Sequence, residues 1–282
     1  MNVVALGGEA CKLAATFGTY PQYDIFYCKE GHDQADGLDL PSMTKVEEAE
    51  STAINFETLK QINKEPVLFV LNGGEEESVY ALRILEQIKD RPITILYIKP
   101  NLNLLNAQRK KIERMVFGVL QEYTRSGLFE KIYLVDYKQM EAIIGDVPIL
   151  GHSQIISKTI VDAVHLLNYL HYTDKIIDKL LSPNPINRIC TIGLFNIETG
   201  EEEKFFDLQE IREKQIFYLL TNHDLTTNKN LMSLINQHTD RLKMEAETVS
   251  FAVAESYHEN SYACTVSYTN LVQGMEKWLT EP

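Results

Sequence analysis

The chain has 282 residues, of which 44 % are hydrophobic and 24 % are charged. This composition is typical of a folded globular protein and excludes a disordered, collagen-like or disulfide-stapled chain. Its 27 basic and 40 acidic residues give a formal net charge of −13, and such a surface repels phosphate backbones and anionic lipids, so we expect neither nucleic acid nor a membrane as partner. The longest apolar runs, such as Val67–Leu71, are too short to span a bilayer.

The first half of the chain alternates between short apolar runs and amphipathic segments. Five runs are predicted as strands: Asn2–Leu6, Tyr23–Tyr27, Val67–Leu71, Ile93–Ile98 and Lys131–Val135. Four segments between them are predicted as helices: Glu9–Phe17, Thr52–Ile62, Glu75–Asp90 and Leu104–Ser126. The acidic stretch Lys29–Lys45, rich in Gly, Pro and Asp, is predicted as a loop. Alternation of strand and helix predicts an α/β fold with a parallel sheet covered on both faces.

A long uninterrupted helix is predicted next, from Ser153 to about Leu181. This stretch has no Gly or Pro, and its apolar residues recur at helical spacing on one face, with Asp174 as the only break. The sequence Ser182-Pro183-Asn184-Pro185 would end the helix and mark a domain boundary. We therefore expect this helix to lie largely buried between two domains.

The last hundred residues predict a smaller α+β domain. Its predicted strands are Arg188–Phe195, Phe205–Leu208, Lys214–Thr221, Glu247–Ser256 and Ser261–Thr269. A helix is predicted over Thr226–Arg241 and another over Leu271–Leu279. His258-Glu259-Asn260 has the composition of a turn, so the last two strands are predicted to form a hairpin.

The cysteines predict the redox environment. Cys11, Cys28, Cys190 and Cys264 are scattered, and no pair has the spacing of a metal or redox motif. The chain also does not open with a basic stretch followed by an apolar one. We expect buried reduced thiols in a cytoplasmic protein.

The order of the predicted elements, together with a few short motifs, resembles the tubulin superfamily, in particular the bacterial cell-division protein FtsZ. The motifs are Gly7-Gly8 after the first strand, Asn72-Gly73-Gly74 after the middle strand, Lys99-Pro100, and Leu134-Val135-Asp136-Tyr137 before the long helix. The resemblance covers Val3 to about Tyr268 and implies three parts: a parallel-sheet, Rossmann-like nucleotide-binding domain (1–152), a central helix and linker (153–187) and a C-terminal α+β domain (188–282). Diverged tubulin-like proteins also occur in phages, and this chain resembles such distant members.

The resemblance also implies positions for a nucleotide site, which would bind GTP or GDP. The positions that correspond to the family's phosphate, ribose and base contacts are Gly7, Gly8, Cys11, Gly73, Gly74, Ser78, Asp136 and Ser157. The family's catalytic acids lie after the long helix, where this chain has Asp174 and Asp178. We assign no metal ligands from the sequence.

Every one of these motifs departs from the family pattern. The signature loop keeps only Gly73 and Gly74 and continues with Glu75, Glu76 and Glu77. Carboxylates beside a phosphate oppose nucleotide binding unless Mg²⁺ intervenes. Acids at a helix start also simply complement the helix dipole and face water, which is their commoner role. Asp174 and Asp178, four residues apart, are better explained as an exposed charged patch at the end of the helix than as a catalytic surface.

Three functions compete on this evidence. The first is a tubulin/FtsZ-like structural or assembly subunit with a degenerate nucleotide site that does not hydrolyse GTP, associating head to tail with itself or docking on a protein partner. The second is an active, filament-forming GTPase. The third, a Rossmann-type cofactor enzyme, lacks the Gly-x-Gly-x-x-Gly motif. A metal site at His32, Asp33, Asp36 and Asp39 fits no ligand spacing, and a solvated loop explains these residues better.

Overall fold

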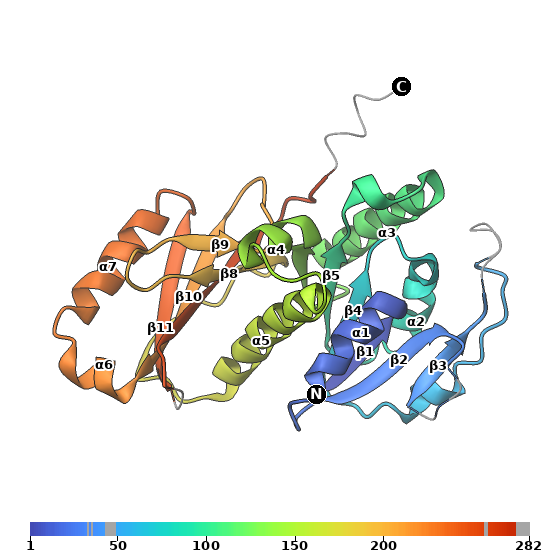
Figure 1. The fold of residues 1–282 in the computed structure, drawn as a ribbon, viewed down its shortest axis with the longest axis horizontal. Helices are drawn as coiled ribbons and strands as arrows, with labels where there is room; N and C mark the ends of the chain where they lie inside the picture. Colours follow the sequence, from blue (N-terminus) through green and yellow to red (C-terminus); the bar gives the residue numbers. More distant parts are fainter. Residues whose placement is uncertain (33, 35, 43–48, 257–258, 275–282) are drawn as a thin grey trace. The chain divides into compact units, whose positions relative to one another are not determined.

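The computed structural model describes residues 1–282 except 33, 35, 43–48, 257–258 and 275–282 (Figure 1). It divides into two compact units: unit 1 comprises Met1–Val161 with Val272–Pro282, and unit 2 comprises Asp162–Leu271. The division falls inside helix α5 (His152–Tyr172), so that its residues up to Val161 belong to unit 1 and the rest to unit 2. Each unit is described by itself.

Unit 1 is built on a parallel sheet with the strand order β3-β2-β1-β4-β5-β6. The strands are β1 (Asn2–Leu6), β2 (Asp24–Glu30), β3 (Gly37–Leu40), β4 (Val67–Asn72), β5 (Ile93–Lys99) and β6 (Lys131–Asp136). All of β1 is buried, as is β4 up to Leu71, because apolar residues fill both faces of these central strands. The predicted α/β fold with a parallel sheet is confirmed.

Helices connect these strands, as the alternation predicts. They are α1 (Gly8–Phe17), α2 (Ala81–Gln87), α3 (Ala107–Arg125) and the 3-10 turns η2 (Glu57–Gln61), η3 (Glu76–Tyr80) and η4 (Leu102–Leu104). A further helix, α4 (Tyr137–Ile144), follows β6 and leads to α5. Among the described residues, no helix is both long and apolar enough to cross a membrane.

Three local predictions for unit 1 are wrong. The predicted helix over 52–62 is only the turn η2, because the Thr52 carbonyl accepts a hydrogen bond from Arg83 Nη1 (2.7 Å) and the Asn55 side chain caps Glu57 N–H (3.1 Å). The predicted helix over 75–90 begins with the 3-10 turn η3, and its α-helical part is limited to α2, Ala81–Gln87. The predicted loop over 29–45 contains β3, which pairs with β2.

Unit 2 has a mixed sheet with the strand order β8-β12-β10-β11-β7, and β9 pairs with β8. The strands are β7 (Ile177–Lys179), β8 (Ile189–Phe195), β9 (Glu202–Lys204), β10 (Glu213–Thr221), β11 (Thr248–Ser256) and β12 (Tyr262–Thr269). Helices α6 (Asn222–Thr227) and α7 (Leu231–Leu242) connect β10 to β11, which run parallel. Ile235 and Leu242 of α7 pack on this sheet in one buried cluster with Ile216 and Val253.

The predicted hairpin between the last two strands is wrong. β10 lies between β11 and β12 and pairs with β11 in parallel and with β12 antiparallel. Both strands are buried along most of their length, so they are central strands rather than the half-exposed ribbon that alternation predicts. The predicted turn is only partly described, since His258 lies outside the described residues, as does most of the predicted terminal helix.

The long helix is also shorter than predicted. It ends at Tyr172, where Thr173 Oγ1 donates a hydrogen bond back to the Tyr169 carbonyl (2.9 Å). The chain then becomes extended, the Ile176 N–H donates to the Val253 carbonyl (2.8 Å), and β7 pairs with β11. This pairing provides hydrogen-bond partners for the backbone groups along the edge of β11, which would stay unpaired if the helix continued. Within unit 2, Leu170 is buried against Leu219, Ala254 and Cys264.

Candidate functional site

The candidate site contains two glycine turns, and the first joins β1 to α1 at Gly7. Its φ of 95° lies in the left-handed region that favours glycine. The Gly7 N–H donates to the Cys28 carbonyl (2.9 Å), and a Cβ atom at Gly7 would overlap the Glu75 carboxylate. Glycine is therefore required here both by the backbone conformation and by the close approach of Glu75.

Glu75 places its carboxylate at the N-terminus of α1. Its Oε1 accepts a hydrogen bond from the Glu9 backbone N–H (2.9 Å), and the residue is only 5 % exposed. Its buried Oε2 has no hydrogen-bond partner. Burial raises the pKa of this carboxyl to about 7, with a smaller contribution from Glu77, against the lowering effect of the Glu9 N–H. The free N–H groups of a helix start attract anions, and here the chain supplies its own anion.

The second turn, Gly73–Gly74, follows β4 and packs closely against β5 and α3. A Cβ at Gly73 would overlap the Tyr97 hydroxyl, and Gly74 has a φ of 78°. Arg109 Nε donates to the Gly74 carbonyl (2.6 Å), and behind it the buried Glu113 accepts from the Tyr97 hydroxyl (3.3 Å). Side chains of the same unit therefore occupy the space beside both glycines.

Three further predicted positions, Ser78, Asp136 and Cys11, are used in local structure. Ser78 is fully buried, and its Oγ donates to the Asn72 carbonyl (3.1 Å). Asp136 caps α4, since its Oδ1 accepts from the Lys138 N–H (2.9 Å). Cys11 is buried with its Sγ 3.6 Å from the Ala5 carbonyl, and burial raises the pKa of the thiol to about 12, so that it is protonated at neutral pH. All four cysteines lie in the described part of the chain and are buried free thiols.

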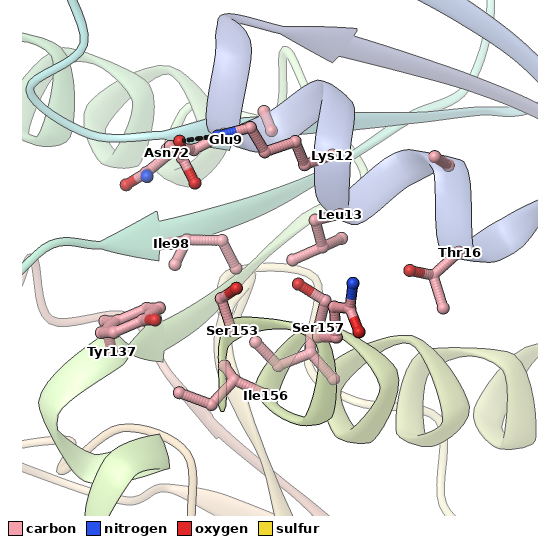
Figure 2. Close-up of a pocket in the computed structure, with 14 residues that line it drawn as sticks. Glu9, Lys12, Leu13, Thr16, Asn72, Ile98, Tyr137, Ser153, Ile156 and Ser157 are labelled. Carbon is pink, nitrogen blue, oxygen red and sulfur yellow. Dashed lines mark hydrogen bonds and ion pairs between the residues drawn. The ribbon is translucent and has the colours of Figure 1, made fainter. Parts of the chain in front are cut away.

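A cavity of about 370 Å³ lies beside these turns, between α1 and the first half of α5. Figure 2 shows Leu13 of α1 facing Ser153 and Ser157 of α5 across it, with Ile98 and Tyr137 at one side. The lining residues are Glu9, Ala10, Lys12, Leu13, Ala15, Thr16, Asn72, Ile98, Tyr137, Ser153, Gln154, Ile156, Ser157 and Ile160. The only charged side chains among them, Glu9 and Lys12, form an ion pair of 2.5 Å, drawn in Figure 2.

The structure brings only some of the predicted site residues to this cavity. Ser157 lines it directly, and Gly8 begins the helix that forms one wall. The glycines at 73 and 74, Ser78 and Asp136 are not among its lining residues. Tyr137, which the resemblance places beside Asp136 in the loop that contacts the ribose, lines the cavity, whereas sequence reasoning did not single out Ser153. The spacing of Ser153 and Ser157 by four residues on one helix face is the signal that could have found Ser153.

The two candidate catalytic acids lie in unit 2, and they do not share a helix. Asp174 is exposed in the segment after α5, whereas Asp178 lies in β7 opposite Ala252. The Asp178 Oδ1 accepts a hydrogen bond from the Leu180 N–H (3.1 Å). The prediction that they lie one helical turn apart is therefore wrong, because the helix ends at Tyr172.

Other clusters of ionisable groups have structural partners. His32 Nε2 lies 2.9 Å from Asp36 Oδ1, and Asp39 accepts from the Gly31 N–H (2.8 Å), while Asp33 lies outside the described residues. Among the described residues no group of three or more His, Cys, Asp or Glu is placed to hold a metal ion. In unit 2, the fully buried Lys214 is paired with Glu202 (2.6 Å) and Glu245 (3.2 Å), which join β10 to β9 and to the segment after α7.

Comparison with known proteins identifies solved structures that share this architecture. No family model matches the sequence, and no curated protein matches it. Among solved structures, TubZ from Bacillus thuringiensis serovar israelensis, in a GTPγS-form protofilament, has a TM-score of 0.67 at 13 % identity, over 99 % of this chain and 88 % of that chain. CetZ1 from Haloferax volcanii, a GDP-bound monomer, has a TM-score of 0.67 at 11 % identity, over 98 % and 96 %. The empty FtsZ dimer from M. jannaschii has a TM-score of 0.65 at 13 % identity, over 98 % and 88 %.

This chain has the tubulin/FtsZ fold. In the tubulin/FtsZ fold of this chain, the turns at Gly7 and at Gly73–Gly74 follow β1 and β4, which are neighbouring parallel strands. The carboxyl ends of such strands are where open α/β sheets bind ligands. The cavity is lined by Asn72, the last residue of β4, and by the first turns of α1, so it lies at this edge.

Proposed function

We propose that this chain is a tubulin-like subunit that associates head to tail, with a nucleotide site that has lost GTP hydrolysis. The observation that carries the proposal is the Glu75 carboxylate at the N-terminus of α1. The fold supports assembly, because TubZ of the same fold is seen in protofilaments and FtsZ as a dimer. The four buried free thiols fit a cytoplasmic location.

Electrostatics explains why Glu75 opposes a nucleotide. The backbone N–H that a phosphate would use at the start of α1 already donates to Glu75. While this carboxylate is ionised, a phosphate oxygen about 5 Å from it would cost roughly 3 kcal/mol at an effective dielectric constant near 20. Because its pKa is about 7, the carboxyl can take up a proton instead, so the repulsion is strongest above pH 7. The second glycine turn offers no substitute, since Arg109 and Tyr97 occupy its surroundings.

Head-to-tail association would join an acidic surface of unit 1 to a surface of unit 2 in the next molecule. Glu76 is exposed beside the second turn, and Glu9 is exposed at the start of α1, whereas Glu75 is buried and does not contribute to this surface. Lys179 is exposed on β7. Such a heterologous contact builds filaments or rings, and each exposed Glu–Lys pair would add about 1 kcal/mol or less.

Sedimentation velocity of the purified chain without nucleotide tests assembly. At about 50 mM salt we expect species larger than the monomer, and at about 500 mM salt we expect them to dissociate, because salt screens exposed ion pairs. A single monomer at both salt concentrations, at high protein concentration, would overturn self-assembly. The acidic surface would then serve a different protein partner.

The second candidate function is an active GTPase that binds GTP or GDP. The cavity beside α1 favours it, since Ser157 is positioned there and a nucleoside would fit its volume. A phosphate-release assay with GTP and Mg²⁺ separates the two functions. We expect no release above background, because Asp178 is held in β7 by its turn with Leu180. Release that is lost in Asp178→Ala would restore the GTPase.

A further inference from the structure

We propose that the outer face of α3 is a two-fold contact surface, on which the α3 helix of a second copy of this chain lies antiparallel. A two-fold contact uses the same surface on both copies and closes a pair, whereas a head-to-tail contact joins two different surfaces and continues. The inference therefore goes beyond the proposed function, and it uses none of the residues assigned to the head-to-tail contact.

The outer face of α3 leaves two large apolar side chains in solvent. Met115 is 44 % exposed and Tyr123 is 41 % exposed. The opposite face of the helix is buried in unit 1, through residues such as Ile112 and Leu120. Exposed apolar residues by themselves are common on protein surfaces, so the argument depends on what lies between these two.

Gly118 lies on this outer face near the middle of α3, and nothing in the described part of the chain requires a glycine there. It is part of the helix and is not among the glycines with a positive φ. A Cβ atom at this position would meet no atom of the described residues within 4 Å. Glycine is also one of the least favourable residues inside a helix. Its small size therefore points to a surface that approaches α3 from outside the chain.

Four residues of the outer face are complementary to the same four residues in reverse order. Lys111, Met115, Gly118 and Glu122 follow one another at intervals of four, three and four, so they lie on one side of the helix. In an antiparallel pair centred between positions 116 and 117, Lys111 faces Glu122 of the second copy. In the same register Met115 fills the open space over Gly118 of the second copy. The two-fold symmetry repeats both contacts.

The other orientation of the two helices lacks this complementarity. In a parallel pair in register, Lys111 would face its own copy and Glu122 would face its own copy, so that like charges oppose each other. Glu122 already pairs with Arg125 on the next turn (2.6 Å), but both side chains remain in contact with solvent. An ion pair of that kind contributes little stability, so it does not prevent Glu122 from pairing with Lys111 of the second copy.

The pair formed by α3 should be weak but resistant to salt. A stable complex buries about 800 Å² on each partner, and one face of a helix of 19 residues offers less. The centre of the contact is apolar, and the net charge of −13 makes the two copies repel each other at low salt. Salt screens this repulsion. The α3 pair should therefore persist at a salt concentration that dissociates the exposed ion pairs of the head-to-tail contact.

Sedimentation equilibrium of the full chain at about 500 mM salt tests the proposal. Over about 10 to 200 μM protein we expect a reversible equilibrium between monomer and dimer. In Gly118→Lys a long charged side chain replaces the open space, and the dimer should dissociate at least about tenfold more readily. Because that position is open and lysine favours helix, the variant should melt at the same temperature or higher, which excludes unfolding as the cause. Gln87→Lys, which makes the same charge change at an exposed position of α2, is the matched control and should leave the dimer unchanged.

Exchange of the two charges tests the antiparallel register. Lys111→Glu and Glu122→Lys each bring like charges together twice in one dimer, so each should weaken it about fivefold. The chain that carries both substitutions should recover the original affinity.

Three results would overturn the proposal. A monomer at every protein concentration removes the dimer, a dimer unchanged in Gly118→Lys lies on another surface, and no recovery in the double variant removes the antiparallel register. Larger species that form only at low salt report the head-to-tail contact instead, so each of the two contacts can fail without the other.

Discussion

Glu75 carries the same sign of charge as the phosphate it would exclude, but it can lose that charge by binding a proton. Its pKa is raised from 4.5 to about 7, mainly because burial penalises the ionised form. The folded state therefore holds this proton more tightly than the unfolded chain. The resulting stabilisation is fully present below pH 4.5 and is lost as the pH rises through about 7.

Glu75→Gln should therefore change how stability depends on pH. The amide is neutral at every pH, so relative to the unmodified chain the variant should gain up to about 3 kcal/mol of unfolding free energy between about pH 5 and about pH 8. Any constant cost of burying the amide cancels in this difference. Urea unfolding at the two pH values measures it, with the exposed Glu76→Gln as control. If the difference in unfolding free energy between the variant and the unmodified chain is the same at both pH values, the raised pKa of Glu75 is contradicted.

At the residue scale, sequence reasoning located the anomaly but not its geometry. The run Glu75-Glu76-Glu77 directly after two glycines was visible, and the commoner meaning of such acids is an exposed helix start. Glu76 is exposed, as that interpretation predicts, whereas Glu75 turns inward and accepts a hydrogen bond from a backbone N–H 66 residues away in the sequence. No local pattern encodes a contact of that separation.

At the scale of elements, strands buried on both faces were the easiest to predict. The five strands predicted in the first half all exist. In β1 and β4, which are buried on both faces, the continuous apolar runs between turn residues have few alternative structures. Errors arose where tertiary partners override local preference. The segment 177–179 continues a helical apolar pattern, yet it pairs with β11. Likewise, β10 separates two strands whose intervening turn residues favour a hairpin.

For the helix that lines the cavity, too, the local apolar pattern was predictable and the tertiary arrangement was not. Ile156 and Ile160 were predicted as part of one buried face, and both are buried. Periodicity could not predict that a cavity interrupts this packing beside Ser157, because a cavity depends on the shape of α1 opposite. Fold and core were therefore more predictable from the sequence than the site.

At the scale of the whole molecule, two electrostatic effects act on assembly in opposite directions. The net charge of −13 makes subunits repel each other. Local pairs between Glu76 of one molecule and Lys179 of the next would attract. Added salt weakens both effects, so salt dependence alone reports only which of the two is larger.

Charge reversal at these two positions separates local pairing from net charge. If the residues pair across the contact, Glu76→Lys and Lys179→Glu should each weaken low-salt association about fivefold, and the double variant should restore it, since an exposed pair contributes about 1 kcal/mol or less. If net charge decides, Glu76→Lys makes the chain less negative and should strengthen association, whereas Lys179→Glu should weaken it. Sedimentation velocity of the three variants at about 50 mM salt distinguishes these patterns. Additive effects of opposite sign would refute pairing between these surfaces and leave the acidic surface of unit 1 as a site for another protein.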